Sequence, residues 1–134
     1  MNAVDFFCGG GGMTKGLMNA GIHVLFGLDL NPSCQETYEN NNGIPYLNRD
    51  ITQITGQQLQ NEYPILNEND NLLLVGCAPC QPFSSQRHSD YAHVSTNLLD
   101  EFGRLVAQIM PAHILVENVP GIVEKLFLID FLHF

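Results

Sequence analysis

The sequence predicts an α/β fold built around a mostly parallel β-sheet, and three observations lead to this fold class. Short apolar runs alternate along the chain with segments of helical periodicity, which is typical of strands joined by crossover helices. The apolar run Leu72–Val75 is unbroken, as expected for a strand that a parallel sheet buries on both faces. Four consecutive glycines, Gly9 to Gly12, follow the first apolar run, at a point where a strand turns into a helix.

In chain order, the first element is a strand that ends just before the glycines, and four more strands follow. The predicted strands are Ala3–Phe7, Ile22–Leu28, Pro45–Leu47, Leu72–Val75 and His113–Val116. The predicted helices are Met13–Ala20, a segment from Asn31 to about Asn41, a short helix near Gln57–Asn61, and a helix from Leu98 to Ile109. Pro32 suits the first turn of the second helix, because its missing N–H is not needed there. Asp50–Thr52 is expected to be a loop, and the polar stretch from Ser84 to Asn97 lacks clear periodicity and predicts a mobile loop.

Composition limits what the chain does by itself. With 134 residues it forms one domain at most, and its hydrophobic content of 45% is that of a globular protein. The net charge of −9, with only five Lys and Arg residues, argues against a DNA-binding surface of its own, because neutralising phosphates needs cations. No apolar run approaches the length that spans a bilayer and no basic segment precedes an apolar one at the N-terminus, so we expect a cytoplasmic protein without a membrane partner. The four cysteines are expected to be free thiols.

A cysteine stands in the loop after the fourth predicted strand, within the sequence GCAPCQPFS. Pro79 and Pro82 hold the backbone extended on either side of Cys80, which presents the thiol on a stiff loop. A side chain at the carboxyl end of a central strand points toward the crevice in which open α/β sheets bind ligands. Three interpretations stay open: a buried structural cysteine, a redox pair or half of a zinc site with Cys77, and a nucleophilic thiolate. The chain has no second cysteine pair to complete a zinc ligand set, so no metal site is predicted.

The glycine run predicts either a close approach of a ligand to the backbone or a tight turn alone. It does not match the dinucleotide-binding pattern, because Thr14 occupies the position of the third glycine. It does not match the phosphate-binding loop either, because Lys15 does not follow a glycine and no Ser or Thr follows it. A cofactor without a pyrophosphate remains compatible with it.

These segments together resemble the DNA (cytosine-5) methyltransferases. Cys80 within APCQPFS is similar to their Pro-Cys-Gln motif, Glu117-Asn118-Val119 to their Glu-Asn-Val motif, and the segment from Asp5 to Gly12 to their cofactor loop. The resemblance runs from the first residues to about Gly121, and it implies a Rossmann-like S-adenosylmethionine-dependent methyltransferase sheet, DNA as the partner and S-adenosyl-L-methionine as the cofactor. The cofactor-binding residues that it implies are Phe7, Gly9, Gly11, Asp29, Leu30, Asp50, Ile51 and Pro79.

Two aspartates suit this cofactor on chemical grounds as well. Asp29 ends the second predicted strand, where a carboxylate accepts hydrogen bonds from ribose hydroxyls. Asp50 and Ile51 resemble the adenine-contacting loop of the family, and Leu30 stands where the family usually has a larger lid residue. A helix cap or a solvated turn remains the alternative for either aspartate.

The resemblance implies covalent catalysis by Cys80. Its thiolate would add to carbon 6 of a flipped-out cytosine, so that carbon 5 becomes nucleophilic, while Glu117 would stabilise the charge that develops on the ring. Asn118 is expected to link the two catalytic loops, and Gln81 and Ser84 are candidates for contacts to the flipped nucleotide. A surface carboxylate is the alternative for Glu117.

The sequence departs from the family after Gly121, because the later strands and the target-recognition domain are absent. We therefore expect residues 1–134 to be a partial catalytic domain, truncated after the fifth strand, with DNA binding that is weak or indirect from this chain alone. Ile114–Val116 would form an exposed apolar edge, and the segment Ile122–Phe134 reads as an apolar helix that must be buried. A homo-oligomer, a complementary subunit with the missing half, or a fragment is expected. The alternatives are a non-catalytic remnant or partner-binding subunit, the same chemistry on RNA, and a thiol redox protein.

Overall fold

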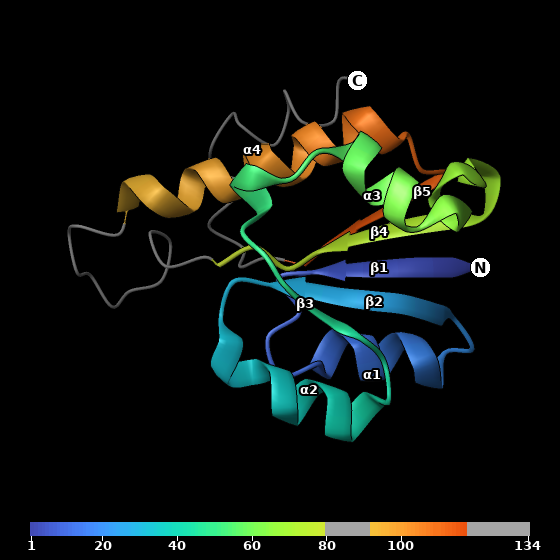
Figure 1. The fold of residues 1–134 in the computed structure, drawn as a ribbon, viewed down its shortest axis with the longest axis vertical. Coiled ribbons are helices and arrows are strands. Elements are labelled where there is room, and N and C mark those ends of the chain that lie inside the picture. Colours follow the sequence, from blue (N-terminus) through green and yellow to red (C-terminus); the bar gives the residue numbers. More distant parts are fainter. Residues whose placement is uncertain (80–91, 118–134) are drawn as a thin grey trace.

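The computed structural model describes the backbone of residues 1–79 and 92–117, and the side chains of 1–79 and 98–117. Its centre is a five-stranded sheet with the strand order β3-β2-β1-β4-β5, and every pairing in it is parallel (Figure 1). The strands are β1 (Asn2–Phe6), β2 (His23–Asp29), β3 (Tyr46–Asn48), β4 (Leu72–Gly76) and β5 (His113–Val116). The α-helices are α1 (Gly12–Asn19), α2 (Gln35–Asn42), α3 (Gly56–Glu62) and α4 (Ala92–Ile109). Short 3₁₀ helices are η1 (Pro32–Cys34), η2 (Ile51–Gln53), η3 (Pro64–Asn67) and η4 (Asn69–Asn71).

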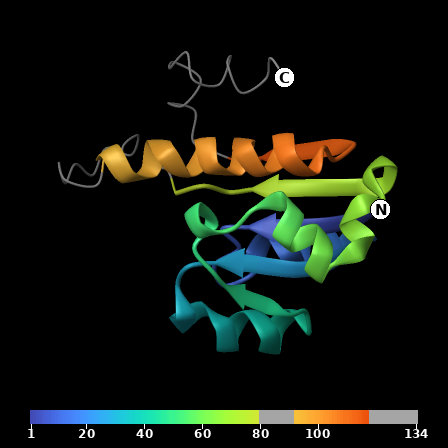
Figure 2. The ribbon, with the colours of Figure 1, turned by 45° about the horizontal axis from the view of Figure 1, so that its top comes forward.

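The sheet lies between two helical layers. Helices α1 and α2 lie on one face, and α3 and α4 lie on the other, with α4 running along β4 and β5 (Figure 2). Alternation along β1 sends Val4 and Phe6 into the core beneath α3 and α4, while Ala3 packs in the cluster that also contains Leu17 of α1. Among the described residues, no helix is both long enough and apolar enough to cross a bilayer. The α/β class with a parallel sheet that the sequence predicts is confirmed.

The central strand β4 is buried at every position, as its unbroken apolar run predicts. Its last residue, Gly76, leaves room for the ring of Phe102 on α4, since a Cβ there would lie 2.8 Å from that ring. The same ring contacts Phe6 edge-on, with the ring centroids 5.5 Å apart. Phe102 therefore fixes α4 over the carboxyl ends of β1 and β4, the strands that the glycine run and the Cys80 segment follow.

The turn from β1 into α1 is fixed by contacts with α2. Gly11 is the N-cap of α1 and has a φ of 89°, a left-handed conformation that favours glycine. A Cβ on Gly11 would lie 2.9 Å from Cδ2 of Tyr38 and would also meet the side chain of Asn42. A Cβ on the next residue, Gly12, would meet no atom within 4 Å among the described residues. The glycine run thus includes one position that requires glycine and one that tolerates a side chain.

The predicted elements match the structure within one or two residues, except at three places. The mobile loop predicted to reach Asn97 is wrong from Ala92 onward, because α4 begins there; residues 84–91 lie outside the described residues. Adding turns to an existing helix is far easier than starting one, so a stretch without its own periodicity joins the amphipathic segment that follows. The second predicted helix starts with the 3₁₀ turn η1, capped by Asn31, and the loop predicted at Asp50–Thr52 contains η2.

Strand β5 lies at the end of the described sheet, paired with β4 only. Ile114 is 46% exposed and Leu115 is 40% exposed, so the apolar edge expected at Ile114–Val116 is present among the described residues. The predicted apolar helix Ile122–Phe134 lies outside the described residues.

Phe102→Ala is expected to destabilise the protein by about 3–5 kcal/mol, because it removes a fully buried ring between β1, β4 and α4. Denaturant unfolding measures this loss. The control is Met110→Ala at a side chain that is 70% exposed, where a change within about 0.5 kcal/mol is expected. Equal effects of the two variants would contradict the packing described for Phe102.

Gly11→Ala is expected to destabilise the protein by at least about 1–2 kcal/mol, because a Cβ is strained at this φ and also displaces Tyr38. Gly12→Ala is the matched control one residue away, and its effect should be neutral or stabilising by up to about 1 kcal/mol, since alanine favours the helix. Thermal unfolding of both variants tests the difference, and a Gly11→Ala protein as stable as Gly12→Ala would show that the turn does not need glycine.

Candidate active site

A cavity of about 160 Å³ opens at the carboxyl edge of the sheet. Its lining comes from segments that follow four different strands, and it consists of Phe7, Leu28, Asp29, Leu30, Arg49, Asp50, Ile51, Pro79 and Leu98. We call it the edge pocket. Six of the eight residues predicted to bind a cofactor line it, although they are spread over most of the chain. Sequence-distant residues thus meet where open α/β sheets bind ligands.

The size and lining of the edge pocket suit one flat ring system. A cavity of about 150 Å³ holds a benzene ring, whereas pockets for whole drug-sized ligands measure about 300–1,000 Å³. The walls combine apolar side chains, among them Phe7 and Ile51, with two carboxylates, Asp29 and Asp50. The pocket therefore fits an aromatic part of a ligand whose polar groups reach the aspartates.

Phe7 reaches the pocket through an unusual backbone conformation. Its φ is 61°, a left-handed value that is uncommon for residues other than glycine. The backbone N–H groups of Phe7 and Cys8 both donate to the carbonyl of Leu28, at 2.8 and 3.3 Å, and hold this conformation. Strained residues of this kind concentrate at ligand-binding sites, which agrees with the predicted role of Phe7.

Asp29 is fixed at the end of β2 by backbone donors. Its Oδ2 accepts a hydrogen bond from the Gly9 N–H at 2.9 Å, and its Oδ1 accepts one from the Asn31 N–H at 2.9 Å. Asp29 therefore does stabilise a turn, which was the alternative that the sequence left open for it. Each carboxylate oxygen carries two lone pairs, so both oxygens retain one for a ligand hydroxyl.

Asp50 and Ile51 are held by α4 as well as by their own turn. Oδ1 of Asp50 accepts from the Thr52 N–H at 2.9 Å and from the Thr52 hydroxyl at 2.8 Å, so Asp50 caps η2. Both of these bonds go to Oδ1, which leaves Oδ2 as the acceptor for a ligand amino group. Nη2 of Arg104 donates to the Ile51 carbonyl at 2.9 Å, and its Nε donates to Glu101 at 2.7 Å. The pocket wall is thus tied to α4, the helix that runs along β4 and β5 (Figure 2).

Gly9 and Gly11 are not among the residues that line the edge pocket. Gly9 acts on it through the bond from its N–H to Asp29, and a Cβ at Gly9 would meet no described atom within 4 Å. Gly11 faces α2, as described above. Their direct contact with a cofactor stays a prediction.

The two predicted catalytic loops leave neighbouring strands at the same edge. Gly76 of β4 pairs in register with Val116 of β5, and the Glu117 N–H donates to the Gly76 carbonyl at 3.2 Å. The expectation that Glu117 follows a strand next to the one before Cys80 is therefore confirmed. The Glu117 residue is exposed. Cys80, Gln81, Ser84 and Asn118 lie outside the described residues, so their roles stay predictions.

Three lining residues were not predicted: Leu28, Arg49 and Leu98. Leu98 gave no signal in the sequence, whereas Leu28 directly precedes Asp29 and Arg49 directly precedes Asp50. The Arg49 guanidinium makes a bidentate ion pair with Glu62, with two N–O distances of 2.7 Å, and this pairing lowers the pKa of Glu62 and raises that of Arg49. Both side chains are partly exposed, so the pair orients Arg49 more than it stabilises the fold.

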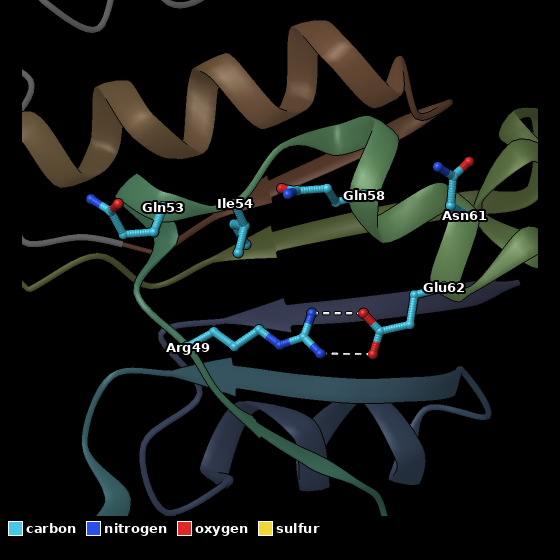
Figure 3. Close-up of a pocket in the computed structure, with 6 residues that line it drawn as sticks. All are labelled: Arg49, Gln53, Ile54, Gln58, Asn61 and Glu62. Atoms are coloured by element: carbon cyan, nitrogen blue, oxygen red, sulfur yellow. Dashed lines mark hydrogen bonds and ion pairs between the residues drawn. The ribbon is translucent and has the colours of Figure 1, made fainter.

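On its other side Arg49 borders a second, open cavity of about 580 Å³, lined also by Gln53, Ile54, Gln58, Asn61 and Glu62. Figure 3 shows the Arg49 side chain extending toward Glu62 at the end of α3. We call this cavity the amide groove. Because its charged groups satisfy each other, it shows no feature that selects a ligand.

A family model for C-5 cytosine-specific DNA methylases matches residues 1–128. The Type II methylase M.HgiDII of Herpetosiphon aurantiacus is 42% identical over 119 residues, which make up 89% of this chain and 33% of that protein. The Type II methyltransferase M.HgiGI of the same organism is 30% identical over 119 residues, 89% of this chain and 90% of that protein.

Among solved structures, an Escherichia coli prophage protein assigned as a DNA modification methyltransferase superposes with a TM-score of 0.75 at 25% identity, over 95% of this chain and 34% of that one. The chain thus spans about a third of the length of M.HgiDII and of the prophage protein. Its sheet has the Rossmann-like fold of S-adenosylmethionine-dependent methyltransferases. From the match over residues 1–128, the chain belongs to the family of C-5 cytosine-specific DNA methylases.

Proposed function

We propose that this chain binds S-adenosyl-L-methionine in the edge pocket and serves as the catalytic half of an enzyme that methylates carbon 5 of cytosine in DNA. One observation carries the proposal: Phe7, Asp29, Asp50 and Pro79, each at or just after the end of a different strand, line one pocket at the edge from which the Cys80 and Glu117 loops depart. Family membership supports the same reaction, because cytosine methylation is what the family is defined by.

The donor set of the edge pocket fits the nucleoside part of this cofactor. Phe7 and Ile51 are apolar surfaces for the adenine ring, Asp50 accepts from its amino group, and Asp29 accepts from the ribose hydroxyls. Leu30, which is 64% exposed, lies at the mouth as a lid over the ring. When bound, the cofactor supplies an electrophilic methyl group on its sulfonium. We assign Gly9 and Gly11 to the backbone that lies next to the bound cofactor, and Pro79 to the part of the pocket wall that directly precedes Cys80.

Catalysis follows from adding a thiolate to the ring before methylation. The Cys80 sulfur forms a bond to carbon 6, and the electrons of the 5,6 double bond become available at carbon 5. Glu117 shares a proton with ring N3 and stabilises the charge that forms there. After carbon 5 gains the methyl group it loses its proton, the double bond re-forms, and Cys80 leaves. Asn118, Gln81 and Ser84 are assigned to holding the two loops and the flipped nucleotide.

The chain is proposed to act with a further polypeptide, either a second copy or a complementary subunit. The exposed apolar side chains of Ile114 and Leu115 on β5 support this, because a sheet edge of this kind is normally covered. The net charge of −9 gives DNA little to bind, so the partner would contribute most of the DNA contacts, and residues 1–134 would be a partial catalytic domain. A cytoplasmic location fits, because the thiol of Cys80 must stay reduced.

Asp29→Asn is expected to weaken binding of S-adenosylmethionine by about 10- to 100-fold, because it replaces a charged acceptor worth about 1.5–3 kcal/mol. Isothermal titration calorimetry measures the affinity. Glu68→Gln is the matched control, since it also converts one carboxylate to an amide, but at an exposed position outside the edge pocket. No binding by the unaltered chain, or an equal loss in both variants, would refute the assignment of the cofactor to this pocket.

Cys80→Ser is expected to abolish the covalent adduct with DNA that contains 5-fluorocytosine, because fluorine cannot leave as a proton does and traps the Cys80 bond. Denaturing electrophoresis detects the adduct. Cys77→Ser, three residues earlier, should retain it, which separates the nucleophile from a redox pair that would need both cysteines. An adduct in Cys80→Ser would exclude Cys80 as the nucleophile. If the unaltered chain forms an adduct with an RNA substrate alone, methylation of RNA is favoured. If it binds the cofactor but forms no adduct, a partner-binding subunit is favoured.

A further inference from the structure

A buried carboxylate lies beneath the glycine run, outside the proposed chemistry. Asp5 of β1 has no exposed surface, and neither does Thr14, the third residue of α1. The Thr14 hydroxyl donates to Oδ2 of Asp5 at 2.7 Å and lies 2.9 Å from the hydroxyl of Tyr38 on α2. These three side chains connect β1, α1 and α2 by one continuous polar chain.

The surroundings leave room for this chain of contacts. Gly27 lies opposite Asp5 in the register of β1 and β2, and a Cβ there would come within 2.5 Å of the Tyr38 hydroxyl and 2.7 Å of Cys8 Sγ. Gly11 leaves room for a different edge of the same ring, because a Cβ there would lie 2.9 Å from Cδ2 and 3.2 Å from Cε2 of Tyr38. Two glycines from separate segments thus admit one tyrosine, whose hydroxyl reaches Thr14.

Asp5 takes the place of the missing cap of α1. The N-cap residue Gly11 has no side chain to accept from the first turn of the helix. Asp5 accepts instead from the hydroxyl of Thr14 in the first turn, and the nearby Thr14 hydroxyl and backbone N–H both favour its ionised form. A negative charge at this end of a helix also interacts favourably with the helix dipole.

The ionised form of Asp5 is nevertheless costly. Its Oδ1 is buried without a hydrogen-bond partner among the described residues. Burial raises the pKa of Asp5 to about 6, and the charge of Asp29 on β2 raises it further, while the bonds from Thr14 oppose this rise. The other titratable groups that face Asp5 are Cys8 and Tyr38, whose pKa values burial also raises, so both stay neutral; its register neighbour on β4, Val75, does not titrate.

The segment between Asp5 and Thr14 contains a contact that links this cluster to a carboxylate of the edge pocket. Gly9, midway along it, donates its N–H to Asp29, the proposed ribose acceptor. We propose that Asp5 is a positioning residue: its ionised carboxylate fixes the first turn of α1 and, through the Gly9–Asp29 bond, the pocket geometry that binds the cofactor. This inference rests on the proposed function, and it assigns a role to a residue that does not itself touch the cofactor.

The stability of the folded chain and its affinity for the cofactor should then respond to pH in opposite directions. The folded pKa is raised, so the stabilising contribution of neutral Asp5 is complete below the unfolded value of 3.8 and is lost as the pH rises through about 6. Cofactor affinity should instead rise over the same interval. With a pKa of about 6, only about one Asp5 in eleven is ionised at pH 5.0, so the affinity there should be about tenfold lower than at pH 7.5.

The test compares the unaltered chain with Asp5→Asn by calorimetry with S-adenosylmethionine and by thermal unfolding, each at pH 5.0 and 7.5. From pH 5.0 to pH 7.5, the melting temperature of the unaltered chain should fall relative to that of Asp5→Asn. Over the same interval, its affinity for the cofactor should rise about tenfold relative to that of Asp5→Asn. Dividing the affinity of the unaltered chain by that of Asp5→Asn at each pH cancels the contributions that titration of the cofactor and of the other carboxylates makes to both proteins. A ratio of affinities that does not change with pH, or stability and affinity that change in the same direction, would overturn the inference.

Thr14→Val and Thr14→Ser provide an independent pair if Asp5→Asn does not fold. Thr14→Val removes the hydroxyl at nearly constant shape and should reduce affinity at pH 7.5 severalfold, whereas Thr14→Ser keeps the donor and should restore it. Equal affinities of the two Thr14 variants would also overturn the role of the polar chain. If the unaltered chain binds no cofactor at pH 7.5, the proposed function itself fails; if it binds and Asp5 has no effect, only this inference fails.

Discussion

The parallel pairing of β1 with β2 on one side and β4 on the other is the constraint on which the rest of the structure depends. The chain builds β1, β2 and β3 in one direction and then returns to place β4 and β5 on the opposite side of β1. Because all five strands are parallel, their carboxyl ends meet at one edge, and the order reverses next to β1. Open α/β sheets bind ligands at this kind of switch point. The residues proposed to bind the cofactor end or follow β1, β2 and β3, while the loops proposed to be catalytic follow β4 and β5.

The same edge is kept in place by close contacts to bare backbone. Gly76 admits the ring of Phe102, and Gly11 and Gly27 admit the ring of Tyr38. One helix on each side is thereby brought close to the carboxyl ends of the strands. The aromatic rings supply the burial, and the glycines decide where the rings can lie, so the position of the edge pocket depends on both.

Much of the fold and of the lining of the edge pocket could be predicted, because the deciding signals are local. The unbroken apolar run of β4 and the position of Asp29 at a strand end are visible without any tertiary information. The start of α4 at Ala92 was not predictable, because a segment with valine, serine and threonine has low helix propensity and joins a helix that begins further on. Leu98 and Arg49 belong to no motif and reach the pocket only through packing. The burial of Asp5 could not be predicted either, because a sequence does not show which aspartate is excluded from solvent.

The central claim is that the edge pocket, and not the amide groove, receives the cofactor. A titration of the ¹⁵N-labelled chain with S-adenosylmethionine, followed by backbone amide chemical shifts, tests it most directly. The account predicts the largest shifts at Gly9, Leu30 and Ile51, with Gln58 and Asn61 of the amide groove unaffected. Shifts concentrated at Gln58 and Asn61, or none at any of these amides at saturating cofactor, would contradict it.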